Sequence, residues 1–82
     1  MSTEQREIPK PLYAVGVQVF FAEPTPTALD NVFVQPNSTG TVISRTFCRK
    51  DWTWVYKVDV TISDLSPLGH YPGIHEDFLY KP

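Results

Sequence analysis

Residues 40–60, which read GTVISRTFCRKDWTWVYKVDV, have the pattern of one β-hairpin. In its second half the even-numbered positions carry large apolar side chains and most odd-numbered positions carry polar ones. Alternation of this kind is typical of a strand with one face in the core and the other toward solvent. The face predicted to be buried consists of Trp52, Trp54, Tyr56, Val58 and Val60.

The pairing within this hairpin depends on the length of its turn. A three-residue turn at 49–51 places Cys48 opposite Trp52 and Val42 opposite Val58. Small side chains of the first strand then face large ones of the second, which favours close packing. This register directs Cys48 into the core, where a cysteine behaves as a small hydrophobic residue.

Further strands are predicted on both sides of the hairpin. Residues 13–21 alternate in the same way, and Gly16 in their middle indicates a bulge or a close approach of another backbone. Residues 32–34 predict a brief pairing, and residues 74–80 predict a last strand entered through a short helical turn at Glu76. In the loop that follows the first strand, prolines at positions 24 and 26 oppose regular ladder pairing.

Length and composition indicate one small domain. The chain has 82 residues, among them eight prolines and four glycines, and none of its segments shows a helical period. We therefore expect an all-β fold, a small barrel of about five short antiparallel strands with one short helical turn. Residues 1–11 are predicted to be a flexible tail and residues 12–82 a single domain.

The corner and core positions of this pattern carry four short motifs, namely Gly16-x-x-Val19, Gly40-Thr41-Val42, Val55-x-x-Val58 and Glu76-x-x-Leu79. They resemble the SH3-like small barrels of cyanobacteria and plastids, such as one of the small reaction-centre subunits of photosystem I and the variable chain of ferredoxin–thioredoxin reductase. The resemblance implies an SH3-like barrel for residues 12–82 and a non-enzymatic protein that docks on partner proteins. No functional residue of those families carries over to this chain.

The charge of the chain bears on its partners and its location. The net charge is −2 and the isoelectric point is about 5.5, whereas a nucleic-acid-binding domain of this size usually has a high one. A single cysteine excludes an internal disulfide and fits a reducing compartment. The sequence contains no apolar run of the roughly 20 residues that span a membrane. We therefore expect a cytoplasmic protein without a membrane span.

Residues with catalytic or metal-binding chemistry do not form a known pattern. His70 and His75 are not at a zinc-site spacing, and Glu76 and Asp77 are adjacent in a predicted strand, so their side chains point to opposite faces. We expect no catalytic residue, no bound metal and no cofactor, and we expect that the protein is not an enzyme. One of the two adjacent acidic residues is predicted to cap or hold a turn.

The hairpin tip is the most informative candidate for a partner surface, because an exposed tryptophan beside arginine is common in protein interfaces. The proline-rich loop is the second candidate, since rigid small domains carry function on loops. The predicted partner-binding residues are Arg45, Arg49, Lys50, Trp52, Glu23 and Asp30.

Two functional hypotheses follow from this surface. The first is a non-catalytic protein-binding accessory or regulatory module of a bacterial cytoplasmic complex, which the resemblance would make cyanobacterial. The alternative is a nucleic-acid-binding barrel that uses the 45–57 hairpin, with aromatic rings stacking on bases and basic residues on phosphates. The net charge disfavours the alternative.

Overall fold

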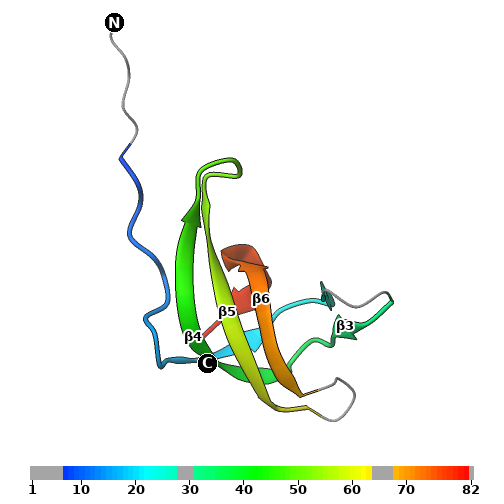
Figure 1. The fold of residues 1–82 in the computed structure, drawn as a ribbon. Helices are drawn as coiled ribbons and strands as arrows, with labels where there is room; N and C mark the ends of the chain where they lie inside the picture. Colours follow the sequence, from blue (N-terminus) through cyan, green and yellow to red (C-terminus); the bar gives the residue numbers. More distant parts are fainter. Residues whose placement is uncertain (1–6, 28–30, 64–67, 82) are drawn as a thin grey trace, which may run out of the picture.

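The computed structural model describes residues 7–27, 31–63 and 68–81, and the chain there consists mainly of strands (Figure 1). The elements are β1 (Gln18–Phe21), β2 (Thr25–Pro26), β3 (Phe33–Val34), β4 (Thr39–Cys48), β5 (Thr53–Ile62), β6 (Gly69–His75), the 3₁₀ helix η1 (Glu76–Phe78) and β7 (Leu79–Tyr80). Five strands form an antiparallel sheet in the order β6-β5-β4-β1-β7, and β2 pairs with β3. The predicted all-β domain of about five antiparallel strands with one short helical turn is confirmed.

The sheet bends around the core. Its two edge strands, β6 and β7, are separated along the chain only by η1, so the end of the chain crosses from one edge of the sheet to the other within three residues. The buried residues are Tyr13, Val19, Phe21, Val34, Val42, Tyr56, Val58, Val60, Tyr71, Ile74 and Leu79. Burial of Tyr56, Val58 and Val60 confirms the alternation predicted for the second arm of the hairpin.

The turn between β4 and β5 has four residues, not three. Residues 49–52 form the turn, so Cys48 lies opposite Thr53 and not opposite Trp52. The predicted register was therefore wrong by one residue near the tip. A bulge between Val42 and Ser44 absorbs this shift, and Val42 lies opposite Val58 as predicted.

The first strand is shorter than predicted. It begins at Gln18, because Gly16 has a φ angle of 93° and turns the chain before it. A Cβ atom at Gly16 would meet nothing within 4 Å, so the backbone angle and not the available space calls for glycine. The amide of Gly16 donates to the carbonyl of Val42 at 2.8 Å, an ordinary backbone hydrogen bond, and no backbone approaches Gly16 closely enough to exclude a side chain. Val15 is 57% exposed and does not share the buried face of Val19.

The two-residue strands β2 and β3 form a small hairpin of their own. Thr25 pairs with Val34 and Pro26 with Phe33, which confirms the brief pairing predicted for residues 32–34. The expectation that both prolines prevent ladder pairing was wrong for Pro26. Proline is tolerated here because a two-stranded sheet consists of edge strands, whose outer amides need no ladder partner. This small hairpin projects from the body of the domain, away from the tip of the β4–β5 hairpin (Figure 1).

Candidate interaction surface

Three aromatic residues of the β4–β5 hairpin form a cluster near its tip. The ring of Phe47 meets the ring of Trp52 at 4.9 Å and 89°, and that of Trp54 at 5.4 Å and 69°. Both contacts are edge-to-face, the geometry that aromatic pairs prefer. All three side chains are half-buried, and Trp54 also packs against the core. We call Phe47, Trp52 and Trp54 the aromatic cluster.

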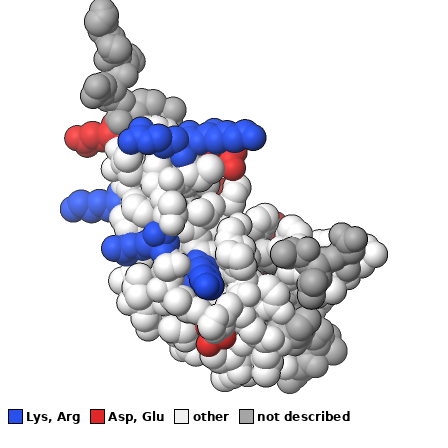
Figure 2. Space-filling model, in the orientation of Figure 1, with Lys and Arg blue, Asp and Glu red and all other residues white. Residues whose placement is uncertain are grey.

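Basic residues surround the aromatic cluster. Arg45, Arg49 and Lys50 are exposed and Lys57 is half-buried, and Figure 2 shows Lys and Arg side chains gathered along the hairpin. The guanidinium carbon of Arg45 lies 5.9 Å from the centre of the Trp54 ring, within the range of a cation–π contact. The same guanidinium group donates to the carbonyl oxygen of Tyr13 at 3.0 Å. The hairpin is therefore locally basic in a chain of net charge −2.

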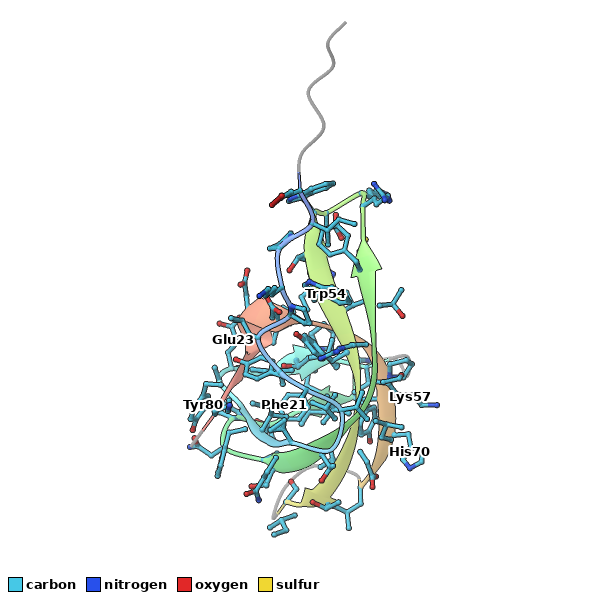
Figure 3. The ribbon with its side chains drawn as sticks, turned by 90° about the vertical axis from the view of Figure 1, so that its left-hand side faces the viewer. Phe21, Glu23, Trp54, Lys57, His70 and Tyr80 are labelled. Carbon is cyan, nitrogen blue, oxygen red and sulfur yellow. The ribbon has the colours of Figure 1, made fainter. Side chains whose placement is uncertain are left out.

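The acidic residues of the predicted partner surface lie elsewhere. Glu23 is exposed between β1 and β2, and Figure 3 shows it on the opposite side of the molecule from Lys57. Asp30 lies outside the described residues. Of the six predicted partner residues, the structure therefore brings together the four of the hairpin, Arg45, Arg49, Lys50 and Trp52.

Trp52 closes the turn with a backbone angle that is unusual for its residue type. Its φ angle is 51°, in the left-handed region that glycine and asparagine adopt more readily. The side chain folds back against Phe47 and stays partly exposed. The alternation had predicted that Trp52 is a core residue of the second strand. It belongs instead to the turn.

Polar side chains link the tip to β6. The carboxylate of Asp51 accepts a hydrogen bond from the thiol of Cys48 at 3.8 Å and lies 3.4 Å from Nε2 of His75. The prediction that Cys48 lies in the core was wrong. Because Cys48 pairs with Thr53 and not with Trp52, it is half-buried beside the turn. His70 pairs with a different carboxylate, that of Asp59, at 3.4 Å. Within residues 7–27, 31–63 and 68–81, no three His, Cys, Asp or Glu side chains converge to hold a metal ion.

A buried tyrosine joins the hairpin to η1 and to the N-terminal segment. The hydroxyl of Tyr56 donates to the Glu76 carboxylate at 2.6 Å and accepts from the amide of Tyr13 at 3.3 Å. Oε2 of Glu76 also accepts from the amide of Leu12 at 3.0 Å. Burial, followed by the hydrogen bond to Glu76, raises the pKa of Tyr56 to about 12. Burial and the charge of Glu76 also raise the pKa of Tyr13.

The chain before Tyr13 lies on the face of the hairpin that carries Trp54. We call residues 8–12 the strap. The indole Nε1 of Trp54 donates to the carbonyl oxygen of Pro9 at 2.8 Å, and Figure 3 shows the N-terminal segment running past Trp54 toward the tip. Sequence reasoning predicted neither this contact nor the role of Phe47. A four-residue turn would have placed Phe47 beside Trp54, but no glycine or asparagine marks that turn.

Together, the fold and this surface define a small all-β domain whose longest hairpin displays aromatic and basic side chains. No model of a protein family, no curated protein and no solved structure matches the chain. In the described part of the chain, no helix has the length and apolar character needed to cross a bilayer.

Proposed function

We propose that the protein is a non-catalytic accessory or regulatory module that binds a partner protein through the tip of its β4–β5 hairpin. The observation that carries this proposal is Trp52, a large aromatic residue held partly exposed at φ 51°. A turn under selection for stability alone would place glycine or asparagine there, and strained residues gather at functional sites.

The composition of the tip supports the same proposal. Tryptophan and arginine dominate the binding energy of protein interfaces, and here Trp52 lies in the same turn as the exposed Arg49. The resemblance to SH3-like accessory proteins supports a role as one component of a larger assembly. By that resemblance the assembly is a bacterial, cytoplasmic one of the kind found in cyanobacteria.

An affinity capture with a matched control tests this proposal. The tip variant is Trp52→Ala with Arg49→Ala. The control variant is Phe33→Ala with Lys81→Ala, which removes an exposed aromatic ring and a cation elsewhere on the surface. We expect the wild type and the control variant to retain the same protein partner from a cell extract and the tip variant to lose it. Equal retention by the tip variant would contradict the proposal.

A second candidate function is the binding of single-stranded nucleic acid. The observation in its favour is the group of basic residues along the hairpin (Figure 2). One of them, Arg45, lies over the ring of Trp54 in the aromatic cluster. Both tryptophans of the chain lie in this hairpin, so their fluorescence reports binding there. Quenching by an oligonucleotide at low salt, reversed at high salt, would support this function; no quenching at low salt would exclude it.

A further inference from the structure

The contact between Trp54 and Pro9 joins an aromatic side chain of the hairpin to the backbone of a proline-containing segment. The strap reads Ile8-Pro9-Lys10-Pro11-Leu12, and its two prolines favour an extended conformation without internal hydrogen bonds. The indole N–H of Trp54 donates to the Pro9 carbonyl at 2.8 Å, and the ring of Phe47 lies beside that indole. Aromatic surfaces that receive such extended segments are a recurring mode of peptide binding.

The strap is only lightly attached to the domain. Leu12 is 64% exposed and Ile8 is 41% exposed, so the strap buries little apolar surface. Besides the bond from Trp54, the amide of Leu12 anchors the strap on the Glu76 carboxylate. Tyr13, in contrast, is 6% exposed and belongs to the core. The strap therefore ends in a firm anchor, while its first four residues are held by few contacts.

We propose that the face formed by Trp54, Phe47 and Arg45 is a binding site for an extended, proline-containing segment of a partner protein, and that the strap occupies this site in the free protein. This inference rests on the proposed function, because it names the class of protein segment that the hairpin binds. The strap leads from Tyr13 past Trp54 toward the tip (Figure 3).

The charge of the tip defines the partner segment further. A partner segment that binds in the same direction as the strap runs toward the tip on the N-terminal side of its proline. The residues before that proline therefore lie toward Arg49 and Lys50, which are both exposed. Acidic residues at those positions gain from the two cations, and the strap itself is preceded by Glu7. The partner segment is therefore proline-containing, with acidic residues before the proline.

The strap competes with any such partner segment. A segment tethered by a short linker has an effective concentration on the order of millimolar, so a free peptide has to exceed that concentration or bind more tightly. Weakening the strap without changing the hairpin then raises the apparent affinity for the free peptide by about tenfold or more.

The test is a titration of the full-length protein, followed by NMR on the indole N–H of Trp54. The probe is the synthetic peptide Glu-Glu-Ile-Pro-Lys-Pro-Leu, and the control peptide has alanine in place of both prolines. The strap variant is Pro9→Gly with Pro11→Gly, and the control variant is Pro24→Gly in the exposed loop after β1. We expect saturable shifts of the Trp54 signal in the strap variant, at an at least tenfold lower peptide concentration than in the wild type or the control variant.

The wild type gives a second reading that does not depend on the strap variant being folded. Excess peptide displaces the first four residues of the strap from Trp54, so the amide signals of Ile8 and Lys10, on either side of Pro9, shift. An unshifted Trp54 signal together with unshifted amide signals of Ile8 and Lys10 at high peptide concentration would overturn the inference. Equal shifts with the proline-free peptide, or shifts produced only by a single-stranded oligonucleotide, would overturn it too.

Failure of this inference is distinguishable from failure of the proposed function. If the tip variant Trp52→Ala with Arg49→Ala loses its protein partner while the peptide does not bind, only the proline-segment site falls. If the peptide binds at Trp54 and the tip variant captures the partner as well as the wild type does, the proline-segment site is supported and the proposed contact through the tip is contradicted.

Discussion

The hydroxyl of Tyr56, on β5, donates a hydrogen bond of 2.6 Å to the carboxylate of Glu76, the first residue of η1. The same carboxylate accepts the amide of Leu12, so this pair joins three segments that are distant in the sequence. Removal of the Tyr56 hydroxyl takes the acceptor away from the buried amide of Tyr13 and leaves Glu76 with one donor fewer.

Tyr56→Phe should therefore lower the free energy of unfolding by about 1–3 kcal/mol. Urea denaturation of the wild type and the variant measures this difference. Tyr80→Phe is the matched control, because its hydroxyl donates to Asn37 at an exposed position and its loss should change the value by less than about 1 kcal/mol. Equal effects of the two substitutions would contradict the role assigned to Tyr56.

The raised pKa of Tyr56 predicts a loss of stability in alkali. The pKa is 10.0 for an ordinary tyrosine and about 12 in the folded protein, so the folded state binds more protons between these values. The stabilisation is fully present below pH 10 and is lost as the pH rises toward 12, by about 2–3 kcal/mol at most. Tyr13 contributes in the same direction.

Denaturation measured at pH values between 9 and 12, spaced by roughly half a pH unit, gives this loss of stability. The slope of unfolding free energy against pH should be negative in that window for the wild type and flatter for Tyr56→Phe. A rising slope, or the same slope in both proteins, would show that the tyrosine is not more readily protonated in the folded state.

Gly40 is required by space and not by its backbone angle. A Cβ atom there would lie 2.5 Å from Cγ1 of Val58 and 2.8 Å from the carbonyl oxygen of Asp59. Gly40→Ala should cost about 1–3 kcal/mol of stability, because an extra methyl group in a packed sheet forces strands apart. Ser44→Ala on the same strand, at an exposed position, should cost less than about 0.5 kcal/mol. Thermal unfolding of the two variants distinguishes them.

The alternation of apolar and polar residues along a strand predicts which of its side chains are buried. The burial of Tyr56, Val58 and Val60 followed from alternation along β5, because the side-chain period of a strand is two. The length of the turn could not be predicted in the same way. A left-handed turn position is usually recognised by its glycine or asparagine, and here it is occupied by Trp52. The extra turn residue changed the partner of Phe47 and moved Cys48 out of the core.

The strap and its anchor depend on contacts that no local pattern contains. Leu12 and Glu76 are 64 positions apart, and Pro9 and Trp54 are 45 apart. A proline-rich segment before the first strand is equally compatible with a flexible tail. Sequence reasoning could therefore find the basic and aromatic residues of the tip but not the segment that lies beside them.

Trp52→Gly separates the stability of the turn from its function. The substitution relieves a backbone strain of about 1 kcal/mol or more and removes an aromatic contact of about 0.5–1.5 kcal/mol with Phe47. The free energy of unfolding should thus change by less than about 1 kcal/mol. Capture of the partner protein should nevertheless be lost. A stable variant that still captures the partner would show that the Trp52 ring is not part of the contact.

The central claim is that a protein binds at the hairpin tip, and site-specific photo-crosslinking tests it most directly. A photoreactive amino acid replaces Lys50 at the tip in one protein and Lys81 near the C-terminus in another, both exposed positions. Irradiation in cells should give a discrete adduct with one protein from position 50 and none from position 81. The absence of a protein adduct at position 50, or an adduct with nucleic acid in its place, would contradict the claim.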